Sequence, residues 1–179
     1  NECTTAAQDP GTIFDNGSIF MAHEFWNGES LSIPGLVDEK ILKNNGTITA
    51  KGTSGHRFVT KSNWRIDCFD RTDGVGEGFR VEAPNGAVYT FAMPRTVKAK
   101  PILKDFKSIS RFHGFMLVTK IEDRFGNWVK YNYNEFVDKK GRVLDRLTSI
   151  TSSDKRTISI DYHETDGYEF NIAKVTANG

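Results

Sequence analysis

The chain is poor in cysteine, proline and long apolar runs, and it carries almost no excess of either charge. It has 179 residues, of which 2 are Cys and 5 are Pro. No apolar run approaches the roughly 20 residues that a membrane-spanning helix needs, so we expect no membrane span. The 24 basic and 23 acidic residues leave a net charge of +1. This near balance gives no electrostatic argument for a nucleic acid or an anionic membrane as partner.

Neither an initiator methionine nor a signal peptide precedes Asn1, so we expect a processed or excised piece of a longer protein. Cys3 and Cys68 leave two alternatives open. One is a disulfide, which an extracellular location favours and which would anchor the N-terminus by about 2–4 kcal/mol. The other is a pair of free thiols.

The chain does contain aromatic residues and turn signals. It has 13 Phe, 5 Tyr, 3 Trp and 16 Gly. Short alternating segments dominate, and helical periodicity is hard to find. Asn-Gly pairs, which suit type I′ hairpin turns, occur at Asn16-Gly17, Asn27-Gly28, Asn45-Gly46 and Asn85-Gly86. In the best hairpin, residues 78–83 and 87–91 each place apolar side chains on one face. We therefore predict an all-β fold of antiparallel β-hairpins.

A stretch of the second half repeats itself. Residues 118–133 and 147–162 align without gaps at an offset of 29. Both read apolar-Thr-x-Ile, then a polar run, then alternating apolar residues ending in Tyr. A third copy begins at Ile172 and is truncated at Gly179. Such a period is typical of repeats that bury their apolar faces against their neighbours, so the two blocks are predicted to be sister hairpins side by side in one sheet.

Composition divides the chain into three parts. Residues 1–97 are predicted to be a β-rich N-terminal region, residues 98–107 a basic connector with one proline, and residues 108–179 the start of a truncated repeat array. Residues 134–146, which are charged and contain Gly141, are predicted to form a loop between the two copies.

These segments resemble Rhs/YD-repeat proteins, and more closely the region where the repeats of bacterial Rhs proteins begin. The resemblance covers most of the chain, and its landmarks are residues 24–28, 31–35, 62–68, 76–79, 83–91 and, most strongly, 121–131. Two departures stand out: Asn134 and His163 follow the repeat tyrosines, where the family has the Asp of its YD motif.

The resemblance implies a ribbon of β-hairpins wound into a shell. In that family the shell encloses, carries or presents another part of the same polypeptide, often a C-terminal toxin domain. The partners it implies are further repeats and a C-terminal effector domain, and the location is secreted or at the cell surface. Because a short array leaves a sheet edge open, we also expect self-association through that edge.

No residue pattern indicates catalysis, and we expect no enzyme, cofactor or metal. His23, His56, His113 and His163 are scattered without metal-ligand spacing. Asp67, Asp70, Asp73 and Glu77 surround a Gly-rich segment, which is either a solvated acidic turn or, as the alternative, a calcium loop. There is no Gly-x-Ser-x-Gly elbow, and Glu122 and Asp123 point to opposite faces of a strand. A hydrolase assembled between the two regions is the weakest alternative.

The alternative function is a carbohydrate-binding or adhesive module that uses exposed aromatics. Its candidate ligand-binding residues are Trp26, Trp64, Trp128 and Tyr131, although aromatics at alternate strand positions usually belong to a core. In the repeat alignment Trp128 matches the polar Thr157, whereas Val129 matches Ile158. We therefore expect Trp128 to face away from the apolar side.

Overall fold

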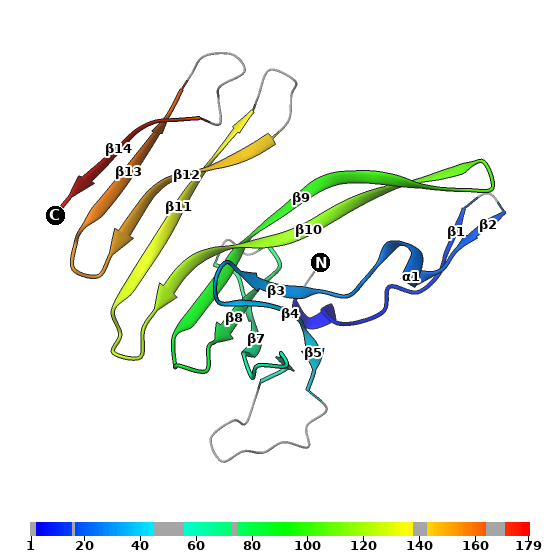
Figure 1. Ribbon diagram of the computed structural model, residues 1–179, viewed down its shortest axis with the longest axis horizontal. Helices are drawn as coiled ribbons and strands as arrows, with labels where there is room; N and C mark the ends of the chain where they lie inside the picture. Colours follow the sequence, from blue (N-terminus) through cyan, green and yellow to red (C-terminus); the bar gives the residue numbers. More distant parts are fainter. Residues whose placement is uncertain (1–2, 16, 45–55, 73–74, 138–142, 164–170) are drawn as a thin grey trace. The chain divides into compact units, whose positions relative to one another are not determined.

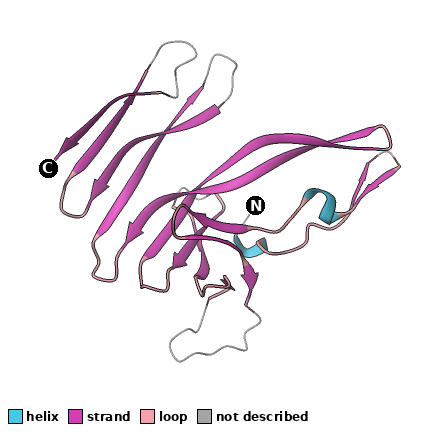
Figure 2. Ribbon diagram, in the orientation of Figure 1, coloured by secondary structure: helices cyan, strands magenta, loops and turns pink. Residues whose placement is uncertain are grey.

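The computed structural model describes residues 3–15, 17–44, 56–72, 75–137, 143–163 and 171–179 (Figure 1). Strands make up most of the described residues, which confirms the predicted all-β fold of antiparallel hairpins (Figure 2). The helical elements within these ranges are the 3-10 helix η1 (Cys3–Thr5) and the α-helix α1 (Ala22–Phe25). Neither they nor any other helix in the described ranges is long and apolar enough to cross a membrane.

The chain divides into two compact units. The first comprises residues 1–84 and 91–117, and the second comprises residues 85–90 and 118–179. The first unit contains β1 (Ile13–Asp15), β2 (Ser18–Phe20), β3 (Ser30–Ile33), β4 (Val37–Lys40), β5 (Leu42–Lys43), β6 (Phe58–Val59), β7 (Arg65–Asp70) and β8 (Glu77–Glu82). The second contains β11 (Trp128–Val137), β12 (Val143–Ser152), β13 (Thr157–Tyr162) and β14 (Ile172–Asn178). The long strands β9 (Val88–Lys104) and β10 (Lys107–Glu122) contribute residues to both.

Strand order follows chain order throughout. Strands β5 to β14 are hydrogen-bonded in sequence, each to its neighbour, while β1–β2 and β3–β4 form separate two-stranded sheets. Every pairing with a recorded register is antiparallel. This topology follows from short turns, which can join only antiparallel neighbours.

The core of the first unit is a row of side chains across β6, β7 and β8. Phe58 lies opposite Ile66, and Ile66 lies opposite Val81. These three are at most 1% exposed. Trp64 joins this core just before β7, at 6% exposure. Burial of a large apolar side chain contributes about 1.5–3 kcal/mol, so this row is a main source of stability for the unit.

The N-terminal segment is tied to the same strands. Cys3 and Cys68 form a disulfide with their Cα atoms 5.5 Å apart, so the disulfide alternative is confirmed. The carboxylate of Glu77 accepts hydrogen bonds from the Thr4 backbone N–H at 2.7 Å and the Thr4 hydroxyl at 2.8 Å. The backbone bond is the main reason why the pKa of Glu77 lies below its usual range, and burial opposes it. The chain start is thus held covalently and by charge-assisted hydrogen bonds.

The predicted connector at residues 98–107 is wrong. Residues 98–104 belong to β9 and Lys107 begins β10, with a two-residue turn between them. The turn residues Asp105 and Phe106 have φ of +48° and +61°, as a type I′ turn requires. No Gly or Asn marks this turn, and Asp105 is its one residue of a type that favours turns. The main segment of the second unit begins at Val118, whereas we predicted that the repeat array begins at residue 108.

The Asn-Gly pairs do not form the predicted type I′ turns where the structure describes them. Asn85-Gly86 does lie between β8 and β9, but only Gly86 has positive φ, at +84°. Asn27-Gly28 connects α1 to β3 and is not a hairpin turn. The pair Asn45-Gly46, and Asn16 of Asn16-Gly17, lie outside the described residues. A single left-handed residue indicates a longer loop than a two-residue type I′ turn, but the predicted hairpin of residues 78–83 and 87–91 is confirmed as the neighbouring strands β8 and β9.

The predicted loop at residues 134–146 is mostly strand. β11 continues to Val137, and β12 begins at Val143. Four pairs extend the ladder there, from Asn134–Arg146 to Val137–Val143. The Arg146 guanidinium lies 3.5 Å from the ring centroid of Phe136, so charge in this segment serves cross-strand packing. Residues 138–142 lie outside the described part of the chain.

Candidate functional site

The two repeats fold as sister hairpins in identical register. In β10–β11, Ile121 lies opposite Val129, flanked by the pairs Lys120–Lys130 and Glu122–Trp128. In β12–β13, the pairs are Ile150–Ile158, Ser149–Ser159 and Thr151–Thr157, each displaced by the repeat offset. Strands β11 and β12 then pair over nine residue pairs, which places the two hairpins side by side. The predicted repeat arrangement is confirmed.

The turns of the two hairpins also match. In the first, the Gly126 N–H donates to the Asp123 carbonyl at 3.1 Å, and the Asp123 N–H donates to the Asn127 carbonyl at 2.8 Å. The same two bonds link Lys155 to Ser152 and Ser152 to Arg156, both at 3.0 Å. Gly126 and Lys155 both have positive φ, at +87° and +70°. This is the three-residue hairpin loop with a left-handed last residue.

Side-chain hydrogen bonds hold the first of these turns. The Asp123 carboxylate accepts from the backbone N–H groups of Phe125 and Asn127 and from the Asn127 amide, at 2.8–2.9 Å. The Asn127 amide is the largest reason why the pKa of Asp123 lies below its usual range. This ionised carboxylate therefore supports the turn, which is a structural role.

Each repeat ends in a tyrosine that closes its own hairpin. The Tyr133 hydroxyl donates to the Val118 carbonyl at 2.9 Å, and the Tyr162 hydroxyl donates to the Leu147 carbonyl at 3.0 Å. Both bonds join the last residue of a copy to its first. We name them the tyrosine locks. The sequence pattern contained these tyrosines as the end of each repeat, but it could not give their acceptors.

The start of the third copy repeats the pattern once more. β14 pairs with β13 as β12 pairs with β11, and a bulge follows the same repeat position in both ladders, after Asn132 and after Asp161. Ile172 lies opposite Tyr162, as Leu147 lies opposite Tyr133. The third copy therefore begins where we predicted.

The sheet of the second unit has two chemically different faces. Directly opposite residues share a face, and the ladders place mainly apolar and tyrosine side chains on one face, with Ser152, Glu135 and Asp145 as the polar exceptions. This apolar face carries Val129, Tyr131, Tyr133, Leu147, Ile150, Ile158, Ile160, Tyr162, Ile172, Val175 and Ala177. The polar face carries Trp128, Lys130, Asn132, Ser149, Thr151, Ser159, Asp161, Lys174 and Thr176.

The apolar face is not covered within the described residues of this unit. Ile158, Ile172 and Val175 are 38%, 54% and 56% exposed. A hollow of 380 Å³ lies on this face, lined by side chains that include Val129, Ile150 and Ile158. Among the described residues of the second unit, only Tyr89 is buried. A single-layered sheet with one apolar side requires something else to cover it.

The four predicted ligand-binding residues do not form one platform. Trp64 is a core residue, and Trp26 is half-buried with its indole N–H donating to Glu29 at 3.4 Å. Trp128 and Tyr131 lie on opposite faces of β11, because they are an odd number of residues apart. Trp128 does face away from the apolar side, as predicted.

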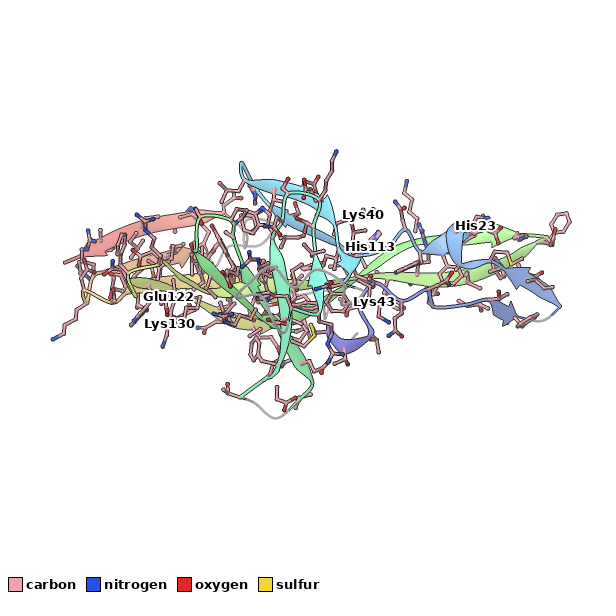
Figure 3. The ribbon with its side chains drawn as sticks, turned by 90° about the horizontal axis from the view of Figure 1, so that it is seen from below. His23, Lys40, Lys43, His113, Glu122 and Lys130 are labelled. Atoms are coloured by element: carbon pink, nitrogen blue, oxygen red, sulfur yellow. A yellow bond between two sulfur atoms is a disulfide. The ribbon has the colours of Figure 1, made fainter. Side chains whose placement is uncertain are left out.

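Trp128 lies among charged side chains on the polar face. The Lys130 ammonium lies 4.8 Å from its ring centroid, and the Lys120 ammonium lies 6.0 Å from it. Lys120 is also paired with Glu122, which is directly opposite Trp128. Glu122 and Lys130 are labelled close to each other in Figure 3. Two cations around one half-exposed indole form a small site that can stack on a ring or attract an anion.

The acidic segment does not form the alternative calcium loop in the part that the structure describes. Glu77 holds Thr4, and Asp67 lies 2.7 Å from His56. Asp70 is directly opposite Glu77, and Asp73 lies outside the described residues. No group of three His, Cys, Asp or Glu side chains that could hold a metal occurs within the described ranges.

Sequence reasoning missed the cluster around His56. Its Nδ1 lies 2.7 Å from Asp67 Oδ2 and its Nε2 lies 3.9 Å from Glu82 Oε2, with the side chain only 14% exposed. Arg65 reaches Glu82 at 3.7 Å. The three partners come from β7 and β8, so the cluster ties the segment before β6 to the sheet. No local motif predicts it, because His56 is distant in sequence from both carboxylates.

Comparisons with known proteins found no match: no protein-family model, no curated protein and no solved structure is significantly similar to the chain.

Proposed function

We propose that this chain is a non-catalytic structural segment of a secreted or surface Rhs/YD-repeat protein, part of a β shell that encloses or presents an effector or toxin domain. One observation carries the proposal: the two repeats are sister hairpins in identical register, paired edge to edge. Their shared turns and tyrosine locks make the repeat a three-dimensional unit as well as a sequence pattern.

Edge-to-edge pairing allows the β-sheet to be extended by the addition of further hairpins. Each hairpin covers the open edge of the previous one, so a long ribbon has few unpaired edges. β14 already begins the next copy with the same bulge. Further hairpins would extend the sheet by the same geometry.

The apolar and polar faces of the sheet support a shell in which one face lines the interior and the other faces solvent. A free sheet with one apolar face exposes surface that soluble monomers normally bury. A closed shell would turn the face of Ile158 and Val175 toward its contents and the face of Asp161 and Lys174 toward water. The Cys3–Cys68 disulfide is compatible with the secreted or surface location that we propose.

Two neighbouring positions on β13 provide the test. Ile158 lies on the apolar face and Asp161 on the polar face, and both are exposed in this chain. Ile158→Cys and Asp161→Cys would be reacted with a maleimide in this chain and in the natural full-length polypeptide. We expect both cysteines to react in the chain alone and only Asp161→Cys to react in the full-length protein. If the full-length protein slows the maleimide reaction equally at both positions, the shell proposal is refuted.

A second candidate function is supported by Trp128. Its indole is half-exposed on the polar face beside Lys120 and Lys130, an arrangement suited to stacking on a sugar ring that carries an acid group. A glycan array with the wild-type chain and Trp128→Ala tests it. Loss of a specific signal in the variant would support carbohydrate binding, and its absence in both would reject this candidate.

A further inference from the structure

The far ends of β9 and β10, residues 97–113, concentrate positive charge, and we name this hairpin the basic arm. It carries one acidic residue, Asp105, against five basic ones: Lys98, Lys100, Lys104, Lys107 and Arg111. Its net charge is therefore +4, whereas the whole chain carries +1, so the remaining residues carry −3. The near-neutral total hides a strongly basic element.

The faces of the basic arm differ. Its two-residue turn places Lys104 opposite Lys107, and the bond from Arg111 Nε to the Lys100 carbonyl at 3.0 Å agrees with this register. The basic side chains therefore share one face. The other face holds no charged residue between 97 and 112. It carries Val97, Leu103 and Phe112, which are 51%, 76% and 62% exposed.

The tip of the arm places an aromatic ring in solvent at a conformational cost. Phe106 is fully exposed, and its φ of +61° is unfavourable for a bulky side chain. A glycine would satisfy the same turn without this strain. A strained and fully exposed aromatic residue indicates a contact made by its side chain.

The N-terminal hairpin β1–β2 covers part of the basic face. Strand β2 lies beside the far ends of β9 and β10 (Figure 1). Lys104 Nζ donates to the Ile19 carbonyl and to Glu24, both at 2.8 Å, and lies 5.8 Å from the ring centroid of Phe20. Only Lys104 among the five cations of the arm has a carboxylate partner recorded in the described residues. Lys98, Lys100 and Lys107 remain exposed, and Leu103 points to the opposite, uncovered face.

We propose that the basic arm binds the surface of an anionic lipid bilayer. Phe106 and Leu103 would enter the boundary between headgroups and acyl chains, and the exposed lysines would contact anionic headgroups. Insertion is shallow, because the outward backbone groups of a two-stranded ribbon need water. A nucleic acid would also attract the lysines, and a single strand can stack a base on Phe106, but it gives no role to the exposed aliphatic Leu103. The arm is separate from the repeats, so this proposal stands apart from the shell.

Cosedimentation with vesicles tests the proposal. The probes are phosphatidylcholine vesicles with and without phosphatidylserine, at low and high salt. We expect binding only to the anionic vesicles at low salt. Phe106→Gly removes the ring while relieving the turn, so the fold is kept; we expect binding about tenfold weaker. Lys98→Gln and Lys100→Gln should each weaken it about fivefold.

A matched control comes from Phe125, which is 75% exposed at the turn between β10 and β11 and lies outside the arm. Phe125→Ala should bind as the wild type does, and an equal loss there would overturn the proposal. So would wild-type chain that stays in the supernatant, or Phe106→Gly that binds unchanged. If a DNA duplex binds tightly, displaces the vesicles and binds the Phe106→Gly variant equally well, the arm is assigned to nucleic acid instead.

Discussion

Removal of one tyrosine lock tests the repeat as a physical unit. Tyr162→Phe deletes the hydroxyl that donates to the Leu147 carbonyl at 3.0 Å and leaves the ring in place. A net hydrogen bond contributes about 0.5–1.5 kcal/mol, and the half-buried carbonyl can regain only part of its solvation. We expect a loss of about 1 kcal/mol in the local stability of the β12–β13 hairpin.

Amide hydrogen exchange is the suitable assay, because two compact units need not unfold together. A loss of about 1 kcal/mol corresponds to exchange about fivefold faster, and it should be confined to the amides of β12 and β13. Tyr133→Phe should give the same effect one repeat earlier, in β10 and β11. Tyr133 lies opposite Leu147, whose carbonyl accepts the second lock. The losses of stability caused by the two substitutions should therefore not add up in the double variant.

Tyr131→Phe is the control. This tyrosine lies on the same apolar face, and no hydrogen bond of its hydroxyl is recorded in the described part of the chain. Removal of the Tyr131 hydroxyl should therefore change amide hydrogen exchange little. The lock interpretation fails if Tyr162→Phe exchanges like the wild type, or if Tyr131→Phe loses as much protection as Tyr162→Phe.

Three further predictions concern turns, the disulfide and pH. Lys155→Gly should stabilise β12–β13 by about 1 kcal/mol in urea-dependent exchange, because Lys155 has positive φ, and Gly126→Lys should do the reverse in the sister turn. Replacing both Cys3 and Cys68 by Ser should cost the first unit up to about 4 kcal/mol by thermal unfolding, since the bond spans 65 residues; an unchanged melting temperature would contradict this. Burial, followed by the charge of Tyr131, raises the pKa of Tyr133. The stability it contributes is therefore complete below about pH 10 and is lost as pH rises through its folded-state pKa, and Tyr133→Phe should flatten this alkaline loss.

The sequence by itself determined the local pattern of the second unit. Two-residue alternation and the offset of 29 gave the sister hairpins, because strands and turns of this length are specified by neighbouring residues. The same alternation placed Trp128 on the face opposite Val129. Comparison of the two copies also placed the start of the third copy at Ile172, where β14 begins.

Only the tertiary structure decided which residues meet across long separations. The Cys3–Cys68 bond and the cluster of His56 with Asp67 and Glu82 join segments that share no local motif. The turn at Asp105-Phe106 contains neither Gly nor Asn, and Phe106 is held at positive φ where two long strands meet. The sequence marked residues 98–107 as basic, but only the pairing of β9 with β10 shows that these cations share one face of a hairpin.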